Sequence, residues 1–271
     1  MLPVFKRNNK KLLFPHALFL ITFLFSLWSN PDLKPMYSPD SYGYWSLAEN
    51  FKHNISEIRP PVFPLLIKLC LTIDSNNWDQ ILSFIQIIFH TSITTLFFFI
   101  FKKLFFNQYL CFLLSLAIGF NPNLLYFSNY VLADHLFAIL TTLSWYYTYK
   151  FNDQPRDQQK QLIYLFAVGI FSGLALITKP IALLMILPII FSILLANGFK
   201  TNVLKMCGLL LILNLSFHFA WSNYKRYHNP SLKFELLDFL ELPINYTALR
   251  AGLVDSGKDS PLYDYLEKNN M

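Results

Sequence analysis

Charged residues are scarce in this sequence: Asp, Glu, Lys and Arg together make up 14% of its 271 residues. A soluble domain carries about a quarter. Hydrophobic residues reach 54% and aromatic residues 18%. A chain of this composition cannot fold in water without exposing large apolar patches, which excludes a soluble globular protein. We therefore expect an integral membrane protein whose solvent is the lipid bilayer.

Cysteine is also rare, and the three cysteines lie in apolar stretches: Cys70, Cys111 and Cys207. None belongs to a Cys-x-x-Cys pair, and none has a histidine at the spacing of metal ligands. Isolated cysteines of this kind exclude a disulfide framework and favour buried packing. We predict neither a metal site nor a cofactor.

The net charge of +6 would suit a protein that binds nucleic acid, but the basic residues do not form one continuous face. They occur as short clusters between apolar runs, which is typical of membrane topology signals. No nucleic-acid partner is therefore expected, and the lipid bilayer is the predicted surrounding.

Seven apolar runs approach or reach the length of a membrane span, which takes about 17 to 25 helical residues. They cover residues 12–28, 79–101, 108–127, 130–149, 162–178, 181–197 and 204–222. The first run follows basic residues, as in a signal peptide, but no small-residue cleavage site follows it, so we expect it to be retained. The sequence predicts an all-α, polytopic membrane helical bundle with about seven transmembrane helices.

Basic clusters indicate the orientation of this bundle. They are Lys6, Arg7, Lys10 and Lys11; Lys102 and Lys103; Lys150, Arg156 and Lys160; and Lys200 and Lys205. Alternation of the runs places all these clusters on one side, which the positive-inside rule makes cytoplasmic. We expect a multi-pass protein of the inner (plasma) membrane with a cytoplasmic N-terminus. The segment 29–77 and a short C-terminal tail, 236–271, would then face outward.

The outer segment 29–77 contains two predicted short helices. In the first, Tyr44, Leu47, Ala48 and Phe51 recur at helical spacing and form an apolar face with aromatic anchors. The second begins near Pro61, because proline is tolerated in a first helical turn. Both are expected to lie on the membrane surface.

Ionisable residues at the predicted outer edge are the candidate site. They are Asp40, Arg59, Asp134, Lys179 and Arg226. A charge just inside the bilayer is costly and usually faces a bundle interior or a wet cavity. A carboxylate with cations on the same side suits the activation of a hydroxyl acceptor and the stabilisation of a departing phosphate. Asp40 would deprotonate the acceptor, and the three cations could bind the phosphate.

The same residues also have structural interpretations. Asp40 could occupy a helical first turn, where free backbone donors favour a carboxylate. Asp134 could pair with His135 or with a neighbouring helix. The cations could anchor the chain at the membrane interface: Arg59, Lys179 and Arg226. A shared cavity would favour the functional interpretation, and dispersal over separate surfaces would favour the structural one.

Five sequence features occur in an order that is shared with known membrane enzymes. They are Pro39-Asp40-Ser41-Tyr42; Arg59-Pro60-Pro61-Val62-Phe63-Pro64; Asn121-Pro122 with Leu132-Ala133-Asp134-His135; Gly173-Leu174-Ala175-Leu176-Ile177-Thr178-Lys179-Pro180; and Trp221-Ser222-Asn223-Tyr224-Lys225-Arg226-Tyr227. With this order and topology, residues 10–235 resemble the GT-C superfamily of membrane glycosyltransferases. The branch concerned contains dolichyl-phosphate-mannose protein mannosyltransferases and lipid A aminoarabinose transferases.

This resemblance implies an inverting glycosyltransferase that takes a sugar from a polyprenyl-phosphate donor and delivers it to a glycan, lipid or protein acceptor. It implies that Asp40 is the catalytic base and that Arg59, Asp134 and Lys179 bind the donor or shape the site. Residues 1–235 would form the GT-C-like module. Relatives usually have more spans, so the chain is expected to be a truncated or minimal copy. The alternatives are a degenerate or non-enzymatic assembly protein, and a lipid-linked sugar transporter.

Overall fold

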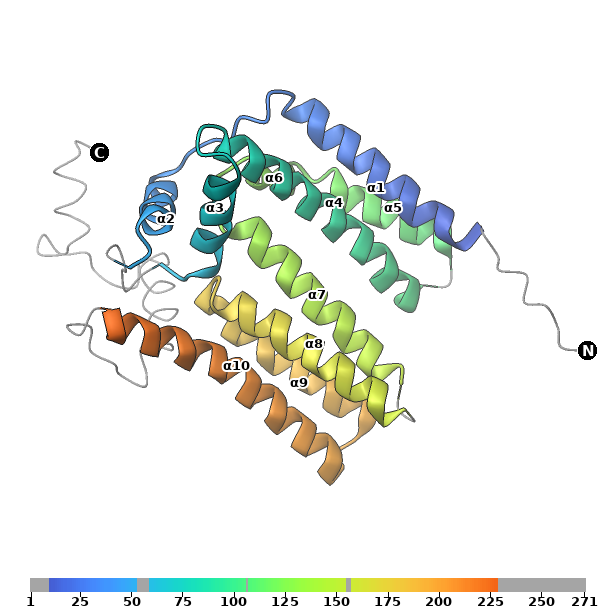
Figure 1. The fold of residues 1–271 in the computed structure, drawn as a ribbon. Helices are drawn as coiled ribbons and strands as arrows, with labels where there is room; N and C mark the ends of the chain where they lie inside the picture. The colour runs from blue at the N-terminus through green and yellow to red at the C-terminus, as the bar shows by residue number, and fades with distance from the viewer. Residues whose placement is uncertain (1–9, 53–58, 106, 155–156, 229–271) are drawn as a thin grey trace, which may run out of the picture. The chain divides into compact units, whose positions relative to one another are not determined.

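The computed structural model describes residues 10–52, 59–105, 107–154 and 157–228, and these residues are almost entirely helical (Figure 1). Lys6, Arg7, Arg156 and the predicted tail 236–271 lie outside the described residues. The helices are α1 Lys10–Ser29, α2 Pro39–Glu49, α3 Val62–Ile73, α4 Trp78–Leu104, α5 Gln108–Gly119, α6 Pro122–Ser128, α7 Asp134–Asn152, α8 Gln158–Leu176, the 3-10 turn η1 Pro180–Ala182, α9 Leu183–Asn197 and α10 Thr201–His228. The predicted all-α class is confirmed over this part of the chain, which contains no strand.

Each of the predicted apolar runs is helical over most of its length. Within the described residues, four helical segments are long and apolar enough to cross a membrane, namely α4, α8, η1 with α9, and α10. A fifth results if the bent pair α5 and α6 is counted as one span. The count of seven remains a prediction, as does the surface position of α2 and α3, both of which are present as helices.

The third apolar run is broken in the middle, between α5 and α6. The two helices meet at an angle of 52°. Pro122 opens α6, because proline fits a first helical turn, and the side chain of Asn121 accepts hydrogen bonds from the next two free backbone N–H groups. On the other side of the break, the Gly119 carbonyl accepts a hydrogen bond from His90 Nε2 at 2.8 Å. The side chains therefore satisfy the backbone where the helix is interrupted.

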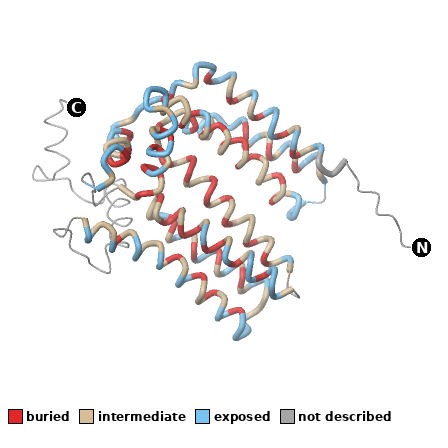
Figure 2. The backbone as a smooth tube through the Cα atoms, in the orientation of Figure 1, coloured by how far each residue is buried: buried red, intermediate tan, exposed pale blue. Residues whose placement is uncertain are grey.

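α7 is more polar than α4, α8 and α9, and it packs against protein on several sides. It contacts α4, α6, α8 and α9, and buried residues run along most of its length (Figure 2). A helix surrounded by other helices needs fewer lipid-compatible side chains than one that faces lipid. This packing explains why α7 falls outside the set of helices apolar enough to span by composition alone.

α7 begins at Asp134, four residues later than predicted. The preceding residues are not helical, and Tyr130 forms an isolated bridge with Met36 in the segment before α2. The Met36 N–H donates to the Asn129 carbonyl at 2.6 Å, and the Val131 N–H donates to the Met36 carbonyl at 3.0 Å. This parallel bridge brings the segments that lead into α2 and α7 together.

α8 and α10 approach closely because α8 has glycines one turn apart. A Cβ at Gly173 would lie 2.3 Å from a ring carbon of Phe217, and one at Gly169 would lie 2.8 Å from a methyl carbon of Leu213. Small residues at this spacing allow membrane helices to pack backbone to backbone. The result is a tight α8–α10 pair.

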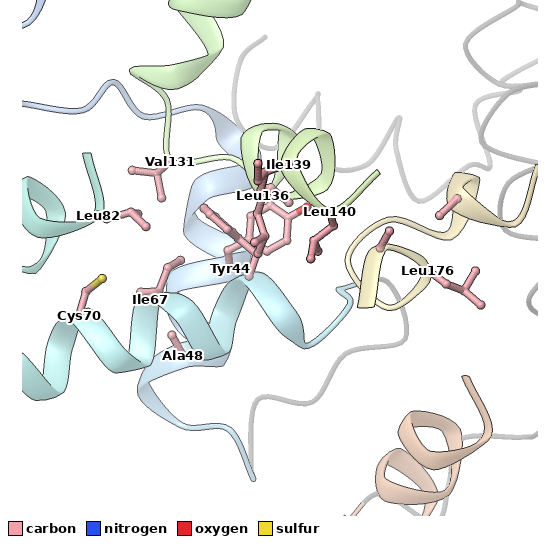
Figure 3. Packing of buried hydrophobic residues seen from close by; sticks show 14 of the residues in the cluster. Tyr44, Ala48, Ile67, Cys70, Leu82, Val131, Leu136, Ile139, Leu140 and Leu176 are labelled. Carbon is pink, nitrogen blue, oxygen red and sulfur yellow. The ribbon is translucent and has the colours of Figure 1, made fainter. Parts of the chain in front are cut away.

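One hydrophobic cluster joins α2 and α3 to the bundle. Tyr44 of α2 and Ile67 of α3 pack with Leu136 and Leu140 of α7, and with Leu176 at the end of α8 (Figure 3). α2 and α3 are thus held at the N-terminal end of α7, where several of the predicted site residues lie.

Candidate active site

The first turn of α2 is docked onto the residues that precede α7. Ser41 Oγ accepts a hydrogen bond from the Ser38 N–H at 2.8 Å and donates one to the Val131 carbonyl at 2.9 Å. Ser38 is the N-cap, and Asp40 lies in the first turn, as predicted. Together with the Met36 bridge, these bonds place the first turn of α2, which carries Asp40, beside the residues that lead into α7 at Asp134.

Asp40 forms an ion pair with Arg59 from the segment before α3. The distance from Arg59 Nη2 to Asp40 Oδ1 is 2.7 Å, and the Asp40 side chain is 50% exposed while that of Arg59 is 22% exposed. The guanidinium also lies over the Tyr44 ring, 4.9 Å from its centroid. Asp40 is therefore accessible, whereas Arg59 is held from two sides.

Gly43 gives Arg59 room to cross α2. A Cβ at this position would lie 2.9 Å from Arg59 Nε. Any side chain larger than hydrogen would therefore push the guanidinium away from its place between Asp40 and Tyr44.

The second ion pair joins Asp134 to Lys179. Asp134 is the first residue of α7, and Lys179 lies between α8 and η1. The distance from Lys179 Nζ to Asp134 Oδ1 is 2.6 Å, and both side chains are about one-third exposed, at 30% for Lys179 and 34% for Asp134. Of the two structural alternatives for Asp134, the structure shows a pair with a neighbouring element, because Lys179 follows α8. The pair with His135 is not formed, since His135 lies against His90 with their ring nitrogens 3.4 Å apart.

Tyr44 lies close to both ion pairs. Burial raises the pKa of its hydroxyl, the positive charge of Arg59 lowers that pKa in part, and the negative charges of Asp40 and Asp134 raise it further. For Arg59, burial lowers the pKa, but the hydrogen bond and charge of Asp40 outweigh it, so the net pKa lies above its ordinary value. Leu136, two residues after Asp134, packs in the same cluster as Tyr44, so the second pair lies near the first.

The residues around the second pair belong to the same packed cluster as Tyr44. Ala133 precedes Asp134 and is fully buried, and Ala182 of η1 is also buried, three residues after Lys179. The structure arranges four of the predicted site residues as two ion pairs beside this one packed cluster: Asp40 with Arg59, and Asp134 with Lys179. Their common outer edge remains a prediction.

Arg226 has a different position. It lies in the last turn of α10, and its side chain is exposed. The same end of α10 reaches the segment after α2, because Phe51 lies 5.9 Å from Trp221 and 6.0 Å from Tyr224 between ring centroids. Arg226 thus lies near the C-terminal end of α2, whereas Asp40 is at its start.

Sequence analysis missed three residues that organise the site, namely Ser41, Gly43 and Tyr44. Tyr44 was placed only on an apolar face, although its ring supports Arg59. A glycine between aromatic residues in a helix was an available signal, because glycine weakens a helix and often marks a close approach. As for metals, the described ranges contain no group of three or more His, Cys, Asp or Glu side chains that could hold an ion.

Comparison with known proteins identifies the family. A family model described as dolichyl-phosphate-mannose-protein mannosyltransferase matches residues 75–221, more than half of the chain. The match includes Asp134 and Lys179 and begins after Asp40 and Arg59. No curated protein and no solved structure matches the chain. The match supports the predicted GT-C superfamily but not the aminoarabinose transferase branch. The chain belongs to the dolichyl-phosphate-mannose-protein mannosyltransferase family and is therefore a multi-pass membrane glycosyltransferase of the GT-C type.

Proposed function

We propose that this protein transfers a sugar from a polyprenyl-phosphate carrier to a hydroxyl group of a protein, glycan or lipid at the outer face of the inner membrane, with inversion at the anomeric carbon. The proposal rests on the two ion pairs near Tyr44. They join Asp40 to Arg59 and Asp134 to Lys179. The family name supports a phosphate-linked lipid donor and a protein acceptor.

Asp40 is the proposed base. Its carboxylate is half exposed, and Arg59 Nη2 contacts only one of its oxygens in the described ion pair. A carboxylate can accept about four hydrogen bonds, so an acceptor hydroxyl can bind beside Arg59. As the acceptor oxygen attacks the anomeric carbon, its proton passes to Asp40. The bond from that carbon to the phosphate oxygen breaks, and its electron pair leaves with the phosphate.

Arg59 and Lys179 are the proposed ligands of the donor phosphate. Arg59 offers a planar set of donors to phosphate oxygens, and Lys179 adds a point charge. Their cationic groups stabilise the negative charge that develops on the leaving phosphate. Asp134 orients Lys179 by its 2.6 Å contact, and Arg226 is a candidate for a further contact from α10.

The lipid tail of the donor would reach this site from the bilayer, and α3 has a surface that suits such a position. Three large apolar side chains recur every fourth residue along α3 and are exposed: Leu65, Leu69 and Ile73. Residues at this spacing lie on one face of a helix. This face supports contact of α3 with lipid beside Arg59.

The test is sugar transfer by Asp40→Asn in the full chain, assayed in membranes with a labelled polyprenyl-phosphate sugar. A general base contributes about a hundredfold to ten-thousandfold, and we expect a loss of that size. Asp32→Asn removes an exposed carboxylate of the same outer segment and should leave transfer unchanged. Unchanged turnover in Asp40→Asn would show that Asp40 is not the base. A stably inserted wild-type chain that transfers no sugar from a range of such donors would favour the non-enzymatic alternative.

A further inference from the structure

A second candidate site lies between α4 and α7 at the end away from the candidate active site. A pocket of about 330 Å³ is lined there by three lysines and two tyrosines, together with Phe99 and Ile100. We call it the lysine pocket: Lys102, Lys103, Lys150, Tyr146 and Tyr149. Lys150 follows Asp134 by 16 positions along α7, which corresponds to about 24 Å of helix.

The parallel packing of α4 and α7 explains why these lysines converge. His90 of α4 lies beside His135 of α7, and nine residues further along α4, Phe99 lies 6.3 Å from Tyr146 between ring centroids. The two helices therefore run side by side in the same direction, and their C-terminal ends meet. Lysines distant in sequence consequently line a single pocket.

The lysine pocket has an excess of positive charge. Lys103 forms an ion pair with Asp153, which offsets one of the three positive charges. The ammonium group of Lys150 lies over the Tyr146 ring, 5.4 Å from its centroid. The described residues that line the pocket carry three positive charges, and Asp153 balances one of them. A net charge of two positive units therefore remains.

This combination matches the chemistry of a phosphate ester at a membrane interface. Lysines attract phosphate as point charges, and tyrosine hydroxyls can donate hydrogen bonds to its oxygens. Tyrosine and lysine are both enriched at the level of lipid headgroups, and the pocket lies at the end of α4, which is long and apolar enough to span. Phe99 and Ile100 offer apolar contact to the part of a lipid just below its phosphate.

We propose that the lysine pocket binds the phosphate-bearing headgroup of an anionic membrane lipid. Lysines that only determine topology need not line a common pocket with tyrosines, and here they do. The site lies at the end of the bundle that the basic clusters predict to be cytoplasmic. It is independent of the proposed sugar transfer, because it uses none of the residues assigned to that reaction.

The experiment is native mass spectrometry of the full chain in detergent, titrated with phosphatidylglycerol and, separately, with phosphatidylcholine. The test variant is Lys102→Gln with Lys150→Gln. The matched control is Lys200→Gln with Lys205→Gln, which removes the same charge from exposed positions at the same predicted side. Equal elution in gel filtration shows that both variants are folded, as expected for replacements of partly or fully exposed lysines.

The wild-type chain should bind phosphatidylglycerol more tightly than phosphatidylcholine. Removing a lysine near an anionic surface weakens binding about fivefold, so the test variant, which lacks two, should bind phosphatidylglycerol about twenty-five-fold more weakly. The control should bind it as the wild type does. An equal loss in test and control variants, or no loss in either, would overturn the proposal. Inorganic phosphate that displaces the lipid at comparable concentration would also overturn it, because the ligand would then be free phosphate.

Discussion

Gly43→Ala should displace the Arg59 side chain while changing the stability of the fold only slightly. The new Cβ would lie 2.9 Å from Arg59 Nε, closer than van der Waals contact allows, while α2 itself accepts alanine. The guanidinium must therefore move. It would leave its 2.7 Å contact with Asp40 and its position over the Tyr44 ring.

The expected change in the free energy of unfolding is small, because opposing effects nearly cancel. Alanine in place of glycine within a helix stabilises by roughly 0.5–1 kcal/mol. A partly exposed ion pair contributes about 0.2–1 kcal/mol, and a cation–π contact at such a site about 0.5–1 kcal/mol. The net change should lie within about 1.5 kcal/mol, which corresponds to a melting-temperature shift of about 3–6 °C or less.

Sugar transfer should respond much more strongly, because misplacement of a phosphate ligand by about 1 Å can cost about a hundredfold. The assay compares transfer and melting temperature in Gly43→Ala with those in Gly208→Ala. Gly208 lies in α10 and has open space where a Cβ would be, so this control makes the same helix substitution without a clash. A Gly43→Ala protein that kept wild-type transfer would refute the assigned role of Arg59.

The remaining predictions concern the second ion pair, the α8–α10 contact and a buried thiol. Asp134→Asn and Lys179→Gln should be coupled by about 1 kcal/mol in a double-mutant cycle on thermal unfolding, because the pair is only one-third exposed; additive effects would contradict this. Gly173→Ala should destabilise by about 1–3 kcal/mol, since its Cβ would lie 2.3 Å from the Phe217 ring, and an unchanged melting temperature would be evidence against this tight packing. Cys70 is fully buried and burial raises its pKa to about 11, so alkylation of the folded protein should be slow at neutral pH; rapid alkylation of the folded protein at pH 7 would contradict it.

The sequence predicted the helices well because apolar runs of span length have few alternatives in a membrane. The sequence predicted the boundaries of these helices less well. The run 130–149 loses its first residues because Val131 pairs with Met36, a contact between segments distant in the chain that local periodicity cannot show. The break between α5 and α6 was marked by Pro122 within the predicted run, but the 52° bend depends on packing.

In the candidate site, too, the sequence predicted the general location of the residues but not the contacts between distant segments. The side of the bundle on which Asp40, Arg59, Asp134 and Lys179 lie followed from the topology and the resemblance. Their partners did not, because each ion pair joins residues far apart in the chain, such as Asp134 and Lys179. The supporting role of Gly43 depends on the path of one guanidinium across α2 and is visible only in three dimensions.

The central claim is that the two ion pairs form one site that holds the donor phosphate. It is tested most directly by a double-mutant cycle on kcat/KM with Arg59→Gln and Lys179→Gln. If both cations bind the same phosphate, the combined loss in the double variant should differ from the sum of the single losses by about 0.5–3 kcal/mol. Losses that add within about 0.5 kcal/mol would indicate independent sites and contradict the account.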